Sequence, residues 1–155
     1  MDTNKKQERY RRLKSQITEL FTKCEDMEAR MATVIAVLHH KMDYFFWTGF
    51  YFLQGNRLIV KMYQGPVACM ELKKNTGVCW AGINQQKTII VSDVHDFEGH
   101  IACDSRSQSE LVVPFFDNKG ILLGVLDIDS SQKNAFDQTD AENLEEILQL
   151  IFTIP

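Results

Sequence analysis

The chain has 155 residues, 45% of them hydrophobic and 25% charged, a composition typical of one globular domain with its own core. Seventeen basic and 21 acidic residues give a formal net charge of −4, which argues against nucleic acid as the main ligand. No apolar stretch is long enough to span a membrane and no leader segment is visible, so we expect a cytoplasmic protein with reduced cysteines.

Residues 1–44 are predicted to form helices. Apolar residues recur there at helical spacing in two groups, Tyr10, Leu13, Ile17, Leu20 and Phe21, then Met27, Met31, Val34, Ile35, Leu38 and Met42. Basic residues cluster at Lys5, Lys6 and from Arg9 to Lys14. We interpret this basic run as a solvated helix face rather than a nucleic-acid-binding arm.

Residues 45–130 are predicted to form a sheet and its loops. An aromatic, β-prone strand over 45–53 and a second over 58–63 form a hairpin, and a short strand follows over 67–72. A short helix is expected from residue 77 to about 86, then a strand over 87–92.

A second hairpin is predicted over 109–116 and 120–130, and the chain closes with a helix over 137–153. Between residues 93 and 108 lies a long segment with little apolar material. A loop of that length inside a compact domain is usually functional.

Three cysteines, Cys69, Cys79 and Cys103, raise the question of thiol redox chemistry, because a positioned thiol can attack an oxidised centre and be regenerated by another. Cys103 stands in polar company that does not suit a core strand: His95, Glu98, His100, Asp104 and Arg106. Free cysteine also packs as a small apolar residue, and that structural interpretation stays open for each of them. Cys24 lies alone upstream.

Several carboxylates stand within predicted strands. Glu110 directly precedes an apolar run, and Asp127 and Asp129 share one strand face because side chains alternate along a strand. If these acids are buried, their repulsion and desolvation should raise the apparent pKa of the group. From the residues alone, the favoured interpretation is that this face is the exposed side of the sheet.

Six segments resemble the free methionine-(R)-sulfoxide reductases, which are built on a GAF domain. In chain order they are WTGFY (47–51), YQGPVAC (63–69), GVC (77–79), DVHDFEGHIACD (93–104), SELVVP (109–114) and GVLDIDS (124–130). The resemblance implies an α+β, GAF-like fold: a six-stranded antiparallel sheet with the N- and C-terminal helices packed on one face and a small pocket over the other. It implies a single GAF domain over residues 1–155.

The resemblance also implies an activity, the reduction of free L-methionine-(R)-sulfoxide to L-methionine. The residue matching Cys103 attacks the sulfoxide sulfur, the residue matching Cys69 resolves the product as a disulfide, and thioredoxin restores both thiols. Cys79 matches a third cysteine whose role is less settled. A homodimer is expected, with no membrane, metal or cofactor.

Further residues receive roles from the resemblance. Glu110, Asp127 and Asp129 match carboxylates that line the substrate pocket, and Asp93 is expected to join them. Trp47 and Tyr51 match aromatic residues of the pocket wall. The chemistry is consistent, because a sulfoxide sulfur becomes electrophilic when a neutral acid such as Glu110 hydrogen-bonds its oxygen. Trp80 stands where glycine is usual, so it either fills space or alters access to Cys79.

Three alternatives remain open. The first is a non-catalytic GAF sensor of a small ligand; Phe136 to Asp140 echo a signature of nucleotide-binding GAF domains, but Ala141 replaces its glutamate. The second is a metal site from His95, His100 and Cys103, whose spacing is irregular. The third is a catalytically idle subunit or scaffold.

Overall fold

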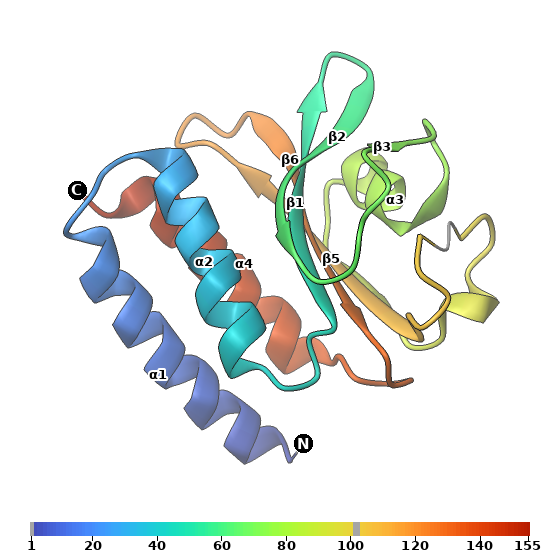
Figure 1. Ribbon diagram of the computed structural model, residues 1–155. Helices are drawn as coiled ribbons and strands as arrows, with labels where there is room; N and C mark the ends of the chain where they lie inside the picture. The colour runs from blue at the N-terminus through green and yellow to red at the C-terminus, as the bar shows by residue number, and fades with distance from the viewer. Residues whose placement is uncertain (1, 101–102) are drawn as a thin grey trace.

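A six-stranded antiparallel sheet in the order β3-β2-β1-β6-β5-β4 forms the centre of the computed structural model, which describes residues 2–100 and 103–155 (Figure 1). The strands are β1 (Trp47–Gln54), β2 (Arg57–Gln64), β3 (Glu71–Leu72), β4 (Ile89–Val91), β5 (Ser109–Phe116) and β6 (Leu122–Ser130). The helices are α1 (Thr3–Phe21), α2 (Met27–Lys41), α3 (Gly77–Gln85), the 3-10 turn η1 (Val94–Asp96) and α4 (Gln138–Thr153).

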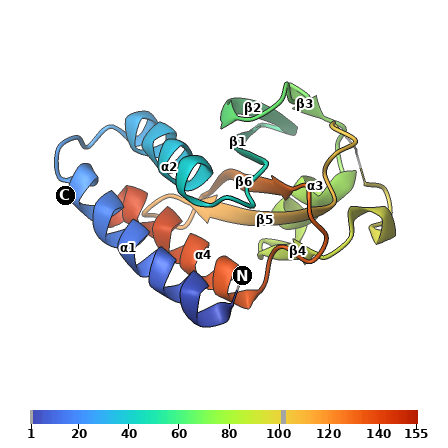
Figure 2. The ribbon, with the colours of Figure 1, turned by 60° about the horizontal axis from the view of Figure 1, so that its bottom comes forward.

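Helices α1, α2 and α4 lie together on one face of the sheet, as Figures 1 and 2 show. Their apolar stripes meet inward-facing strand residues in one core, in which Tyr10, Ile17, Leu38, Leu111 and Leu126 are fully buried. Helices α2 and α4 pack on the sheet, α1 packs against both of them, and the predicted GAF fold is confirmed. None of the helices in the described residues has the length and apolar character needed to cross a bilayer.

The opposite face of the sheet carries a second, smaller core. Because strand side chains alternate, Val112 and Val125 point away from the three long helices and pack against residues of α3 such as Val78 and Ile83. Helix α3 and the loops around it thus cover part of this face (Figure 2).

The basic run of α1 is not wholly solvated. Lys6 is 2% exposed, and its ammonium group lies 2.6 Å from the Asp140 carboxylate and 2.9 Å from Asp137 at the start of α4. Tyr10 and Tyr44 both donate hydroxyl hydrogen bonds to Asp140. The prediction of a solvated face is wrong for Lys6, because Asp140 of α4 supplies a buried carboxylate at that point.

Arg30 joins the ends of the long helices. Its guanidinium group is buried and donates to backbone carbonyl groups only among the described residues, including those of Phe21, Cys24, Ile151 and Ile154. Carbonyl groups at the last turn of a helix have no intrahelical donor. The contacts of Arg30 therefore supply hydrogen-bond donors to such carbonyl groups of both α1 and α4.

Two strands are shorter than predicted. The segment expected over 67–72 forms a strand only at β3, which pairs with Leu58 and Ile59 of β2. The one expected over 87–92 is reduced to β4. Residues 101 and 102, inside the predicted loop, lie outside the described residues.

Candidate functional site

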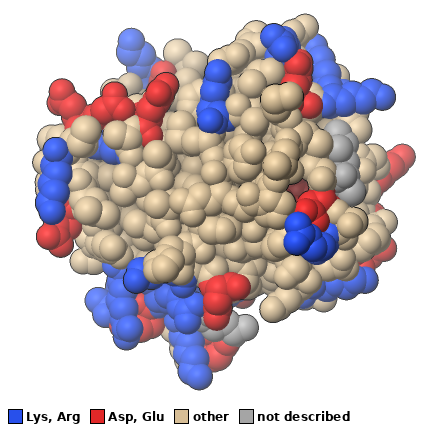
Figure 3. All heavy atoms as spheres, in the orientation of Figure 1, with Lys and Arg blue, Asp and Glu red and all other residues tan. Residues whose placement is uncertain are grey.

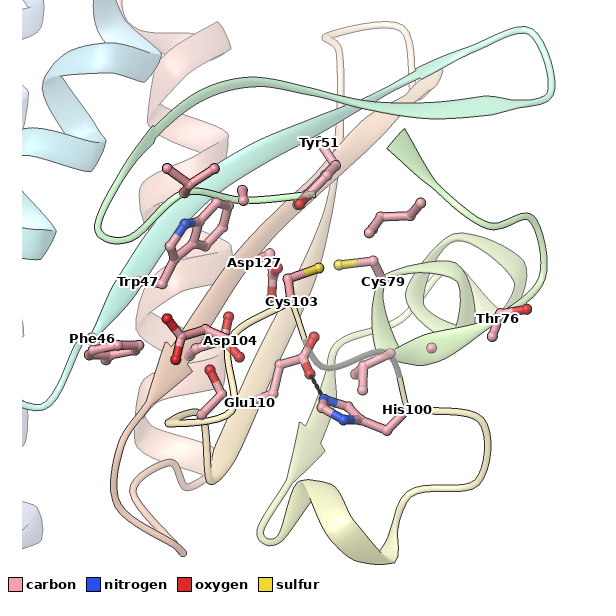
Figure 4. A pocket seen from close by; sticks show the side chains of 17 residues that line it. Phe46, Trp47, Tyr51, Thr76, Cys79, His100, Cys103, Asp104, Glu110 and Asp127 are labelled. Atoms are coloured by element: carbon pink, nitrogen blue, oxygen red, sulfur yellow. Dashed lines mark hydrogen bonds and ion pairs between the residues drawn. The ribbon is translucent and has the colours of Figure 1, made fainter. Parts of the chain in front are cut away.

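A pocket of about 590 Å³, including its open mouth, lies on the sheet face opposite the long helices, between β1, β5, β6, α3 and the loops that contain residues 65–70 and 103–107 (Figure 4). Side chains from Phe46 to Asp129, which are 83 residues apart in the sequence, converge on this one small cavity.

Aromatic side chains from β1 form one wall. The Trp47 ring stacks between Tyr51 and Tyr63, with ring centroids 5.9 and 5.2 Å away. Gly49 makes this possible, since a Cβ atom there would collide with the Trp47 ring. Trp47 and Tyr51 line the pocket as predicted, and their polar atoms face the segment that follows β2.

Two hydrogen bonds fix that segment. Trp47 donates its indole N–H to the carbonyl of Pro66 at 3.1 Å, and Tyr51 donates its hydroxyl to the carbonyl of Cys69 at 2.8 Å. The aromatic wall thus positions Cys69, one of the three cysteines considered for thiol redox chemistry.

Cys69 and Cys103 form a disulfide, with their Cα atoms 5.7 Å apart. Cys103 lines the pocket, whereas Cys69 does not and lies in the segment beside its mouth. The disulfide therefore sits where the cavity meets the surface, and it joins the two cysteines that the family resemblance pairs.

Three carboxyl groups point into the pocket from two adjacent strands. Glu110 on β5 is paired in register with Asp129 on β6, and Val112 with Asp127, so the three acids share one sheet face. Glu110 and Asp127 are buried and Asp129 is partly buried. The expectation of an exposed face is wrong, because α3 and the neighbouring loops cover it.

Burial raises the pKa of all three carboxyl groups well above their usual values. For Glu110 the second cause is the charge of Asp129, for Asp127 it is Glu110, and for Asp129 it is Asp127. The pocket therefore favours the neutral, protonated form of these carboxyl groups. His100 Nε2 lies 3.1 Å from the Glu110 carboxylate, and burial lowers the pKa of this histidine, which favours its neutral form.

Cys79 occupies the first turn of α3, as predicted, and is buried. Its sulfur and one oxygen each of Glu110 and Asp127 all lie within 4.8 Å of one another, the arrangement in the described residues that could best hold a cation. Burial, followed by the charges of Asp127 and Glu110, raises the pKa of the Cys79 thiol. The Oδ1 atom of Asp127 has no hydrogen-bond partner among the described residues.

Trp80 does not block the pocket. Its side chain is buried in the second core, outside the pocket lining, and its indole N–H donates to the carbonyl of Leu72 at 3.2 Å. The residue fills space behind α3 and ties that helix to β3.

Among the described residues, no lysine or arginine lines the pocket. The nearby guanidinium group of Arg106 pairs with Asp104 at 2.7 Å, lowers the pKa of that carboxyl to about 2, and stacks on the Phe46 ring. Asp104 and Ser107 also line the cavity and were not predicted, although their proximity to Cys103 in the loop was a signal.

Asp93, unlike the other predicted acids, has its contacts away from the pocket. It lies outside the pocket lining, where it caps η1, accepts a hydrogen bond from the His95 backbone and forms an ion pair with Lys133. These contacts, Lys133 first, lower its pKa. Its expected role in substrate binding stays a prediction, made for a residue outside the pocket lining. The alternative metal site fails as well, because His95 points to Asp93 and Cys103 is in the disulfide.

Comparison with known proteins gives the family. The family model described as "GAF domain" matches residues 24–152, which is most of the chain. The chain belongs to the GAF domain family. It is 44% identical over 147 residues to GAF domain-containing protein A of Dictyostelium discoideum, a match that covers 94% of this chain and 92% of the relative.

The chain is also related to free methionine-R-sulfoxide reductases. It is 44% identical over 108 residues to the enzyme of that name from Saccharomyces cerevisiae, covering 68% of this chain and 60% of the relative. The structure of free methionine-R-sulfoxide reductase from Neisseria meningitidis in complex with its substrate superposes with a TM-score of 0.86 at 38% identity, covering 92% of this chain and 85% of that one.

Proposed function

We propose that the protein reduces free L-methionine-(R)-sulfoxide to L-methionine with its cysteines as the reductant. The observation that carries this proposal is the Cys69–Cys103 disulfide at the mouth of a pocket that holds Glu110, Asp127 and Asp129, with no lysine or arginine among its described lining residues. Kinship with free methionine-R-sulfoxide reductases supports the substrate class.

In the first step, Glu110 acts as the acid and Cys103 as the nucleophile. The raised pKa of Glu110 keeps its carboxyl group neutral, so it can donate a hydrogen bond to the sulfoxide oxygen and make the sulfur electrophilic. The Cys103 sulfur attacks, the sulfur–oxygen bond of the substrate breaks, and the oxygen ends on Cys103 as a sulfenic acid while methionine leaves.

In the second step, the Cys69 thiol condenses with this sulfenic acid. One molecule of water leaves and the disulfide forms. A dithiol such as thioredoxin then returns two electrons and two protons and restores both thiols. The raised pKa of Cys79 makes it a poor nucleophile, and we assign it no covalent step.

Recognition of the free amino acid follows from charge. A substrate ammonium group would find acceptors in Asp127 and Asp129, including the unpartnered Oδ1 of Asp127, and would compensate the acidic pocket. Methionine sulfoxide inside a peptide lacks this ammonium group. The Trp47 ring would pack on the substrate methyl group.

The test is direct. Purified protein is incubated with dithiothreitol and each resolved diastereomer of free methionine sulfoxide, and methionine is measured by amino-acid analysis. We expect turnover of the R form, and none of the S form or of a peptide-bound sulfoxide. Equal turnover of the peptide would overturn the free-amino-acid assignment, and binding without turnover would favour a sensor.

The cysteine roles need single-turnover measurements. Cys103→Ser should release no methionine, because a hydroxyl group is far less ionised than a thiol at neutral pH. Cys69→Ser should release about one equivalent in a burst and then stall with thioredoxin, while dithiothreitol rescues it. Mass spectrometry of the cysteines follows each reaction. A burst in Cys103→Ser, or none in Cys69→Ser, would reverse the assignment.

A further inference from the structure

Large apolar side chains are exposed at four positions in the described chain: Tyr63 at 38%, Val67 at 84%, Met70 at 78% and Ile121 at 57%. Three of the four belong to the segment 63–70, which contains Cys69. Single exposed apolar residues are ordinary, but a group of them in one short segment indicates an interaction surface.

The segment 63–70 is held in place rather than loosely attached. The carbonyl groups of Pro66 and Cys69 accept hydrogen bonds from the aromatic wall, and the carbonyl of Met70 accepts one from the backbone N–H of Val60 on β2 at 2.9 Å. An apolar side chain therefore stands in a fixed position on each side of Cys69. A surface that is already ordered loses little entropy when a partner binds.

The surroundings of the segment are basic. Lys61, Lys73 and Lys74 are exposed, and none of them forms an ion pair with a described residue. Figure 3 shows few charged side chains in the centre of this face of the molecule and more at its edge. An apolar centre with uncompensated lysines beside it is complementary to a partner with an apolar centre and an acidic rim.

We propose that segment 63–70, with Lys73 and Lys74, is the docking surface for a protein that carries two redox-active thiols on an apolar surface with acidic surroundings. The inference rests on the proposed function, since it places the partner that reduces the Cys69–Cys103 disulfide. Met70 directly follows Cys69 and Val67 lies two residues before it, so a partner seated there brings its thiols to this disulfide.

The redox step balances with this partner. One partner thiolate attacks the Cys69 sulfur, the bond to Cys103 breaks, and Cys103 leaves as a thiolate that takes up a proton in the pocket. The second partner thiol then attacks the mixed disulfide and releases Cys69. The partner is oxidised to a disulfide, and two electrons and two protons pass to this protein.

Met70→Ser tests the apolar contact, because Met70 lies outside the pocket lining and its backbone hydrogen bond is retained. Ile121→Ser is the matched control: Ile121 is exposed but lies in the turn between β5 and β6, away from segment 63–70 (Figure 1). Turnover is measured with thioredoxin, thioredoxin reductase and NADPH, and separately with dithiothreitol. We expect Met70→Ser to raise the KM for thioredoxin about tenfold, with the dithiothreitol rate unchanged.

The lysines are tested by charge reversal. Lys73→Glu/Lys74→Glu should lower kcat/KM for thioredoxin and weaken its dependence on salt, whereas the exposed Lys119→Glu in the β5–β6 turn should do neither. Unchanged thioredoxin kinetics in both Met70→Ser and Lys73→Glu/Lys74→Glu would overturn the proposal. Equal losses of turnover with thioredoxin and with dithiothreitol would overturn it too. So would a change of oligomeric state of Met70→Ser in size-exclusion chromatography, which would make the surface a contact between copies. Absence of dithiothreitol turnover in the wild type would instead refute the proposed function.

Discussion

Buried charges are treated in opposite ways on the two faces of the sheet. On the helix side, Lys6 meets Asp140 at 2.6 Å, and the guanidinium group of Arg30 is surrounded by backbone carbonyl groups. On the pocket side, Glu110 and Asp127 are equally buried but have no cationic side chain in the described lining.

This difference distinguishes buried charges that stabilise the fold from buried acids that serve the site. A buried charge with a partner serves the fold, because breaking the pair leaves an uncompensated ion in a medium of low dielectric constant. A buried acid without a cation is costly in the free protein, and that cost is relieved when the acid is protonated or when a cationic ligand arrives. The pocket carboxyl groups are therefore expected to limit stability while they support chemistry.

The largest expected effect is on the pocket side. Glu110→Gln keeps the shape of the side chain but removes its transferable proton, so turnover of the R sulfoxide should fall by about 10²–10⁴-fold. Glu142→Gln, on the exposed face of α4, is the control and should leave turnover unchanged. Near-normal turnover in Glu110→Gln would move the acid role to Asp127 or Asp129.

On the helix side, the change to make is Lys6→Met, which leaves the Asp140 carboxylate without its ammonium partner. We expect the free energy of unfolding to fall by about 3 kcal/mol in urea titrations, with turnover retained below the transition. Lys5→Met alters an exposed neighbour and should change stability by less than about 0.5 kcal/mol. Equal effects of the two substitutions would show that the buried pair contributes nothing.

The smallest effect has the opposite sign. Asp127→Asn should raise the free energy of unfolding of the reduced protein by about 1 kcal/mol at pH 8, although it should impair turnover, because it removes an acid that is desolvated in the fold. The pKa of Asp127 in the folded protein lies above its ordinary value of 3.8. The wild-type protein therefore loses stability as the pH rises from the ordinary pKa of the carboxyl group to its raised pKa in the fold.

The gain from Asp127→Asn should therefore disappear below about pH 4, where the carboxyl group is protonated in both states. Asp96→Asn, at an exposed position in η1, is the control and should show no such pH-dependent gain. A loss of stability at pH 8 in Asp127→Asn would contradict the contrast between the two faces.

Local pattern predicted most of the fold. Apolar spacing predicts the long helices, and β-prone segments separated by turn residues predict the two hairpins, because each of these signals is carried by neighbouring residues. The short strands were overestimated, since residues 67–70 have no full partner strand and a sequence window does not reveal whether one is available. The pairing of Cys69 with Cys103 is implied by the family resemblance, and the structure contains this disulfide.

Contacts between distant residues were not predictable in the same way. Without the family resemblance, the residues alone predict an exposed face for Asp127 and Asp129, because nothing nearby in the sequence shows that α3 covers it. The Lys6–Asp140 pair spans 134 residues, and the sequence does not reveal that Asp93 pairs with Lys133. Each of these outcomes depends on which element packs above the residue.

Arg30 has a consequence for local unfolding. Because its one guanidinium group binds the last turns of both α1 and α4, neither helix end can open without breaking contacts that also order the other. The amide groups of these two turns should exchange their hydrogens as one cooperative unit. In that respect the C-terminal turns of α1 and α4, far apart in sequence, behave as a single structural element.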